Sequence, residues 1–208
     1  MNTQFKKISK LPSYFAIASL LAFSGLSIAA PAMPEASSTS SNAMIDNFDD
    51  PSNNTYGIPR QFFNDTVSGG NTTTELNVAD GVMHLKGKIA PARGQPGWAS
   101  SVLLLDPQGQ PMDASEFAGI RLLVKVNAGN ISISANSIEV TNFDYHTAQV
   151  PVAADGKFHE VKIPFDSMKR AWSEQTSLNT KTINGVSIVA FDLQKANFDF
   201  AVDEVSFY

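Results

Sequence analysis

Hydrophobic and polar residues alternate along much of the chain. Residues 120–126 carry an aliphatic side chain at every second position, and residues 131–134 and 161–165 repeat the pattern. A period of two places the aliphatic set on one face of a β-strand. The alternation therefore predicts half-buried strands over these three ranges.

Turn-forming residues separate these segments. Asp80-Gly81 and Asp155-Gly156 are predicted to close two-residue hairpins, because both positions of such a turn need a positive φ. Residues 127–130 read Asn-Ala-Gly-Asn and are predicted to turn the chain between two strands. Only residues 164–175 are predicted to contain a short helix, since nothing else beyond the N-terminal apolar run sustains a 3.6-residue period.

Two segments are apolar at both odd-numbered and even-numbered positions. Residues 102–105 and, apart from Ser187, residues 186–191 are expected to form strands that are covered on both faces. Short strands and turns at this spacing predict an all-β domain, an antiparallel β-sandwich or jelly roll.

The final predicted strand changes register. Apolar residues occupy even positions over 198–202 and odd positions over 205–207. A β-bulge at Asp203-Glu204 would restore a single apolar face, because a bulge adds one residue to one strand. The bulge would re-aim two carboxylates, which we interpret either as part of a site or as solvated acids at a kinked edge.

The first 29 residues are predicted to be a secretory signal peptide. Lys6, Lys7 and Lys10 precede an apolar run over 14–28, and the small residues after it place cleavage after Ala29. A retained membrane anchor, the alternative, needs about 20 apolar residues, and this run has roughly fifteen. The protein is therefore expected to be exported, to the periplasm or the cell exterior, with no transmembrane anchor after cleavage.

The rest of the chain is predicted to hold a tether and one domain. Residues 30–43 are rich in Ala, Pro, Ser and Thr and are expected to be a flexible tether. Residues 44–208 are expected to be the β-sandwich. A length of 208 residues with 43% hydrophobic positions suits one such domain.

Composition excludes several classes of partner and chemistry. Fifteen basic and 20 acidic residues give a net charge of −5, which disfavours nucleic acid as a partner. The chain has no cysteine. Disulfides, lipid attachment through cysteine, cysteine-ligated zinc and thiolate catalysis are therefore excluded.

Four segments of the chain stand out, namely residues 45–50 (IDNFDD), 113–122 (DASEFAGIRL), 158–165 (FHEVKIPF) and 198–208 (FDFAVDEVSFY). Together they resemble the complex I intermediate-associated protein 30 family. The resemblance implies a β-sandwich whose first and last strands lie close together, and a non-catalytic role in the assembly of respiratory complex I. An export signal places the chain away from a matrix or cytoplasmic assembly factor, so we carry over the fold and keep the assembly role as an alternative.

Similar segments occur in jelly-roll carbohydrate-binding modules of the galactose-binding-domain-like fold. We therefore predict an exported, non-catalytic binding module for a carbohydrate or protein partner. One alternative is an assembly factor or chaperone for a membrane complex like complex I, acting through an exposed apolar patch. A second alternative is a weak glycoside hydrolase.

Five residues are predicted ligand contacts. Sugars stack on exposed aromatic rings while neighbouring polar groups fix their orientation, which selects Trp98, Trp172, Tyr145 and His146. Arg121 shares the non-core parity of its strand and is a candidate for a polar groove. The alternative interpretations are aromatic plugs over the core and a solvated strand face.

Five carboxylates near the two ends of the domain are predicted metal ligands, namely Asp46, Asp49, Asp50, Asp203 and Glu204. Calcium takes six to eight oxygen ligands, which a loop and a bulge can donate together. The resemblance to carbohydrate-binding modules implies a structural calcium near such terminal strands. The alternative is a set of capping and solvated carboxylates.

No motif in the sequence indicates catalysis. His84, His146 and His159 lack the spacing of a zinc-protease helix, and residues 97–101 lack the Gly-x-Ser-x-Gly frame of a nucleophile elbow. A glycosidase needs only two carboxylates at a suitable separation. The hydrolase alternative therefore stays open, and no catalytic residue is assigned.

Overall fold

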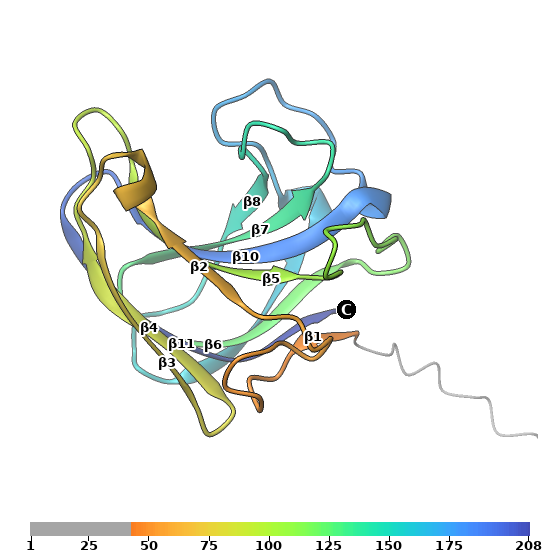
Figure 1. The fold of residues 1–208 in the computed structure, drawn as a ribbon, viewed down its shortest axis with the longest axis horizontal. Helices are drawn as coiled ribbons and strands as arrows, with labels where there is room; N and C mark the ends of the chain where they lie inside the picture. Colours follow the sequence, from red (N-terminus) through yellow and green to blue (C-terminus); the bar gives the residue numbers. More distant parts are fainter. Residues whose placement is uncertain (1–42) are drawn as a thin grey trace, which may run out of the picture. The chain divides into compact units, whose positions relative to one another are not determined.

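The computed structural model describes residues 43–208 (Figure 1). The predicted signal peptide and residues 30–42 of the predicted tether lie outside these residues. Ala43 is half-buried, and its carbonyl oxygen accepts a hydrogen bond from the backbone N–H of Phe207 at 3.0 Å. Between residues 43 and 208, no helix is long and apolar enough to cross a membrane.

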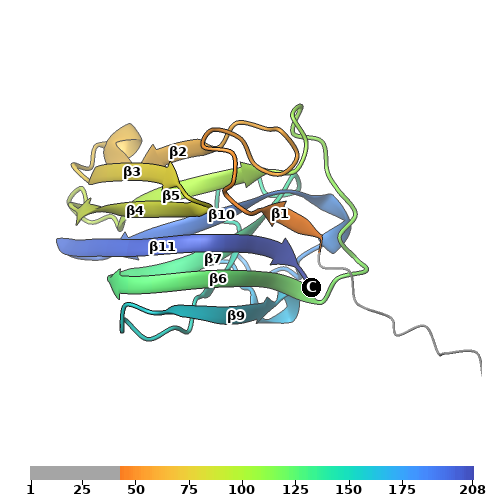
Figure 2. The same cartoon turned by 90° about the horizontal axis from the view of Figure 1, so that it is seen from below.

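Two antiparallel sheets pack as a β-sandwich, which confirms the predicted fold class (Figure 1). The six-stranded sheet has the order β3-β4-β11-β6-β9, and β1 also pairs with β11 (Figure 2). Its strands are β1 (Met44–Asp46), β3 (Thr73–Ala79), β4 (Val82–Ile89), β6 (Gly119–Ala128), β9 (Phe158–Pro164) and β11 (Ala196–Phe207).

The five-stranded sheet has the order β2-β5-β10-β7-β8. Its strands are β2 (Gln61–Asn64), β5 (Gly97–Leu104), β7 (Asn130–Ser137), β8 (His146–Gln149) and β10 (Ile183–Asp192). The described helices are short 3₁₀ turns: η1 (Asp65–Ser68), η2 (Phe165–Ser167) and η3 (Thr180–Thr182). The helix predicted within residues 164–175 is thus reduced to η2.

One of the two predicted hairpins forms. Asp80 and Gly81 have φ values of 52° and 74° and join β3 to β4, with Ala79 opposite Val82. The hairpin predicted at Asp155-Gly156 does not form, because the strands on either side of it, β8 and β9, lie in different sheets. Strand alternation and turn residues do not reveal which sheet the next strand joins.

The predicted β-bulge lies in β11. The register between β11 and β6 shifts between Val202 and Glu204, so Asp203 is the extra residue. Val202 and Val205 consequently both face the core and are fully buried. β1 pairs with the part of β11 that follows the bulge, so the first and last strands lie side by side, as the resemblance implies.

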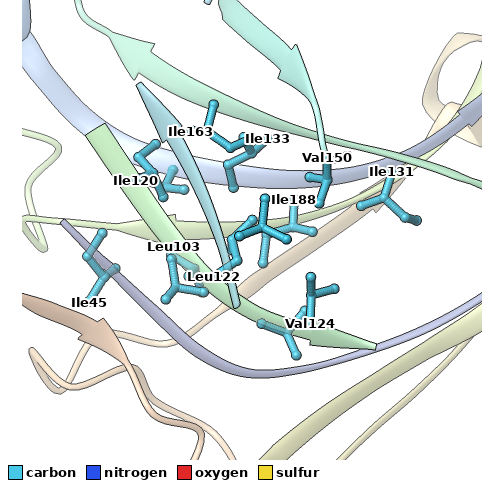
Figure 3. Close-up of a cluster of buried hydrophobic side chains, with 14 of the residues drawn as sticks. Ile45, Leu103, Ile120, Leu122, Val124, Ile131, Ile133, Val150, Ile163 and Ile188 are labelled. Carbon is cyan, nitrogen blue, oxygen red and sulfur yellow. The ribbon is translucent and has the colours of Figure 1, made fainter. Parts of the chain in front are cut away.

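The hydrophobic core lies between the sheets (Figure 3). Leu122 and Val124 of β6 come from one sheet, and Leu103 of β5 and Ile188 of β10 come from the other; all four are at most 1% exposed. Removal of this apolar surface from water stabilises the domain. A domain of this size can bury enough surface to fold without disulfides.

Candidate functional site

Alternate residues of the five-stranded sheet face away from the core. Ala99, Leu103, Ile133 and Ile188 pack inside, so the positions between such residues point outward. We call these outward positions the five-stranded face. They are Gln61 and Phe63 of β2, Trp98, Ser100, Val102 and Leu104 of β5, Gly185, Ser187, Val189 and Phe191 of β10, Asn130, Ser132, Ser134 and Asn136 of β7, and Thr147 and Gln149 of β8.

Apolar side chains on the five-stranded face are only half-buried. Val102, Leu104 and Val189 keep part of their surface in contact with water. The prediction that residues 102–105 and 186–191 are covered on both faces is therefore wrong for the outward face, since β5 and β10 belong to an outer layer of a two-layer sandwich. Apolar residues grouped on an exposed strand face indicate a contact surface.

Three aromatic residues also belong to the five-stranded face. Trp98 and Phe191 lie opposite each other in the β5–β10 register and are half-buried. Phe63 of β2 is 47% exposed. Of the five predicted ligand contacts, Trp98 alone occupies this face. Phe63 and Phe191 were missed, although the apolar run over residues 186–191 contained the signal for the second.

Small polar side chains lie between these apolar groups. Ser100, Ser132, Ser134 and Ser187 are all buried on the outward side of the sheet. The Asn136 Nδ2 donates to the Ser187 Oγ at 2.7 Å. The Asn136 Oδ1 is buried between β7 and β10 and has no hydrogen-bond partner among residues 43–208.

The five-stranded face carries no ionisable side chain at any of its outward positions. The outer face of the six-stranded sheet is different. A hollow of about 540 Å³ on it is lined by charged and polar residues, namely Glu75, Asn77, His84, Lys86, Lys125, Asn127 and Asp199 together with Leu76. Charges distinguish the two faces, and the five-stranded face suits an uncharged ligand.

Arg121 lies on the outer face of the six-stranded sheet. Its Nη1 is 2.5 Å from the Glu204 Oε2, and its Nε is 2.8 Å from the Glu160 Oε2. The hydrogen bond with Glu204, followed by that with Glu160, holds the pKa of Arg121 above its ordinary value against the effect of burial. The structure therefore pairs Arg121 with carboxylates and does not bring it to Trp98.

The other predicted ligand contacts gather near the start of β8. Trp172 is 68% exposed, and Tyr145 is half-buried, which raises the pKa of its hydroxyl. His146 is buried, and its Nε2 donates to the Thr176 carbonyl oxygen at 2.8 Å. Trp172 and Tyr145 are accessible to a ligand, whereas His146 faces inward and supports the loop that contains Thr176.

The predicted calcium ligands form separate contacts. Both oxygens of the buried Asp46 accept hydrogen bonds from Arg60, at 2.6 Å from Nε and 2.8 Å from Nη2. Asp50 accepts the backbone N–H groups of Asn53 and Ser52, which lower its pKa. These two carboxylates have structural partners of their own.

Among residues 43–208, the Asp203 carboxylate has no such partner. Burial raises its pKa, and the neighbouring charges of Glu204 and Asp49 raise it further. Within the described part of the chain, no three His, Asp or Glu side chains are arranged to hold a metal ion. The geometry therefore does not fit a calcium site built from all five carboxylates.

Calcium removal and the substitution Asp203→Asn test this conclusion together. A folded-state pKa above 3.8 means that the ionised Asp203 destabilises the fold. This effect is absent below pH 3.8 and grows as the pH rises through the folded-state pKa. We expect Asp203→Asn to raise the free energy of unfolding at pH 7 by up to about 0.5 kcal/mol, and EDTA to leave the Tm unchanged. A Tm that falls in EDTA, with a destabilised Asp203→Asn variant, would establish a calcium site instead.

A known protein family matches most of the described domain. The profile of the family described as complex I intermediate-associated protein 30 matches residues 48–202. A search of curated proteins finds no match. The match to the family profile covers nearly all of the described domain.

Solved structures share the sandwich. The family 11 carbohydrate-binding module of the cellulosomal cellulase Lic26A-Cel5E of Clostridium thermocellum has a TM-score of 0.57 at 18% identity, over 80% of this chain and 93% of that chain. A family 11 module from Clostridium thermocellum in complex with a β-1,3-1,4-mixed-linked tetrasaccharide has a TM-score of 0.56 at 18% identity, over 80% and 94% of the two chains. At this identity the likeness shows the fold alone.

Proposed function

Because the chain belongs to the complex I intermediate-associated protein 30 family, we propose that it uses the sandwich of that family as an exported, non-catalytic module that binds a neutral carbohydrate. The five-stranded face is the proposed binding surface. The assembly of a membrane complex, which the family name suggests, is the competing function and becomes an outcome of the test.

The observation that carries this proposal is the composition of the five-stranded face. It combines three aromatic rings, half-buried aliphatic residues and buried hydroxyl groups, and it has no charge. A sugar ring presents an apolar face and a rim of hydroxyl groups. Sites for such ligands are mainly apolar, with a few fixed polar groups that set orientation.

The same face supports a non-catalytic role. Hydrolysis of a glycosidic bond needs two carboxyl groups that flank it. None of the outward positions of the five-stranded face is Asp or Glu. A glycan bound there would meet no acid and base pair from these strands.

The substitution Trp98→Ala tests the proposed function. We expect a glycan array to identify neutral polysaccharide ligands, and Trp98→Ala to weaken their binding about tenfold or more, because burial of a large apolar side chain contributes about 1.5–3 kcal/mol. Calorimetry with the best array ligand measures the loss.

Two further variants make this test specific. Phe63→Ala removes a more exposed ring of the same face and is expected to weaken binding without unfolding the domain. Phe158→Ala removes an exposed ring from β9, on the six-stranded sheet, and is expected to leave affinity unchanged. Binding to no neutral glycan, together with capture of membrane-complex subunits from an envelope extract, would favour the assembly role.

A further inference from the structure

Two large aromatic side chains are exposed on loops beside the five-stranded face. Phe143 precedes β8 and is 78% exposed, and Trp172 follows η2 and is 68% exposed. A single exposed apolar residue is common on protein surfaces and requires no explanation. What sets these two apart is how firmly their backbones are held.

A buried carboxylate joins the two loops. Asp144, which is 1% exposed, accepts the backbone N–H groups of Ala171, Trp172 and Ser173 at 2.8, 3.1 and 2.6 Å. Burial alone would raise the pKa of Asp144, but these hydrogen bonds lower it below its ordinary value. The Arg170 Nε also donates to the Asp144 carbonyl oxygen at 3.1 Å. The backbone that carries Trp172 is thus fixed to the loop that carries Phe143.

Asn142 adds a second connection between the same loops. Its Oδ1 accepts a hydrogen bond from the Arg170 Nη2 at 2.9 Å, and its Nδ2 donates to the Ser173 Oγ at 2.8 Å. Between Asn142 and Asp144, Phe143 has a φ of 61°. This left-handed conformation is uncommon for a residue with a bulky side chain. Strain held in place at an exposed ring is typical of a functional position.

The two loops extend one end of the five-stranded sheet. Lys169 and Thr147 exchange backbone hydrogen bonds of 2.9 Å, which attach the Trp172 loop to the free edge of β8. Figure 1 shows the loops before β8 and β10 rising beyond this sheet, away from the six-stranded one. The loop between β4 and β5, which leads into Trp98, lies at the opposite end (Figure 1).

The length of the strands separates Trp98, at one end of the five-stranded sheet, from the loops of Phe143 and Trp172 at the other end. Trp98 begins the outward positions of β5, and Leu104 ends them. Six residues of extended chain span about 20 Å. Between these ends lie Ser100, Ser132, Ser134 and Ser187.

We propose that Phe143 and Trp172 form a second contact for the ligand of the five-stranded face, so that the ligand is an extended neutral polysaccharide chain. The inference rests on the proposed function. A mono- or disaccharide is too short to reach both ends, whereas a chain of several sugar rings offers apolar ring faces at each end and hydroxyl groups between them. Two linked contacts bind one chain more tightly than either contact alone.

Tryptophan fluorescence can observe each end separately, because the chain has only two tryptophans. The variants Trp98→Phe and Trp172→Phe each leave one tryptophan as the reporter. The probes are β-1,3-1,4-mixed-linked glucan oligosaccharides, from the disaccharide to the hexasaccharide. We expect the hexasaccharide to change the emission of both tryptophans, and the disaccharide to change that of Trp98 alone.

Calorimetry supplies the matching affinities. We expect the hexasaccharide to bind wild-type protein at least about tenfold more tightly than the disaccharide, and Trp172→Ala and Phe143→Ala each to remove most of that gain. Phe158→Ala is the matched control and is expected to keep it. Because the rings of Phe143 and Trp172 are exposed, both variants are expected to melt like the wild type.

The outcomes separate the two proposals. A hexasaccharide that changes only the Trp98 emission, or binds no better than the disaccharide, overturns the second contact and leaves the proposed function standing. A response from Trp172 alone overturns both the proposed surface and the spanning chain. Absence of binding by every oligosaccharide counts against the carbohydrate function itself.

Discussion

Arg60→Ala is expected to lower the free energy of unfolding by about 3–5 kcal/mol, because it leaves the carboxylate of Asp46 buried and unpaired. The two side chains are each 1% exposed. The Arg60 Nη1 also donates to the Asp50 carbonyl oxygen at 2.8 Å, and the guanidinium lies 4.9 Å from the centre of the Phe48 ring. Urea unfolding monitored by fluorescence measures the change.

Two controls separate the buried charge from the loss of a side chain. Arg121→Ala breaks more exposed ion pairs and is expected to cost less than about 1 kcal/mol. The double variant Asp46→Leu/Arg60→Met removes both charges and is expected to be more stable than Arg60→Ala. If Arg60→Ala costs no more than Arg121→Ala, the buried Arg60–Asp46 pair matters no more to stability than the exposed pairs of Arg121.

Phe207→Ala is also expected to lower the free energy of unfolding, by about 3–5 kcal/mol. Phe207 is fully buried near the end of β11, with ring centroids 5.3 Å from Phe117 and 6.0 Å from Phe165. The substitution leaves a cavity where three separate segments meet. Urea unfolding again measures the loss, with Phe158→Ala as the control for an exposed ring.

The control variant Phe158→Ala removes an exposed ring in place of a buried one. Phe158 is 37% exposed, and its removal is expected to cost about 1 kcal/mol or less. Equal losses for the two variants would mean that the end of β11 is not part of the core. The bulge at Asp203 would then have no role in directing Phe207 inward.

Local patterns in the sequence predicted the strands and the bulge. The alternation over residues 120–126 became β6, and the change of parity after Val202 became the shift of register at Asp203. Both are properties of a few consecutive residues, because the side-chain period of a strand is two. The hairpin at Asp80-Gly81 was predicted correctly for the same reason, because the turn type depends on these two residues.

Features that depend on distant partners were not predicted. Asp155-Gly156 has the composition of a hairpin turn, yet β8 and β9 join different sheets. The apolar parity of Val102 and Val189 indicated a second covering layer, and the sandwich has none there for residues 43–208. A run of apolar residues indicates that a strand face is removed from water. It does not show whether another layer of the same protein or a ligand covers that face.

The candidate site shows the same limit. Trp98 was one of the predicted aromatic contacts, but no local pattern linked it to Phe63 on another strand. The role of Asp144 was not predictable from its own sequence position, because its hydrogen bonds to residues 171–173 exist only after two loops meet. Arg121 shares a strand face with charged partners that come from β9 and β11.

The position of β11 also sets the order of events during synthesis. It is the last strand of the domain, yet it lies between β4 and β6, and β1 pairs with it as well. Until β11 leaves the ribosome, β4 and β6 have no common neighbour, and the six-stranded sheet is divided into the pairs β3-β4 and β6-β9. A nascent chain therefore cannot complete the sandwich early. Any factor that acts on the growing polypeptide meets it before its tertiary structure has closed.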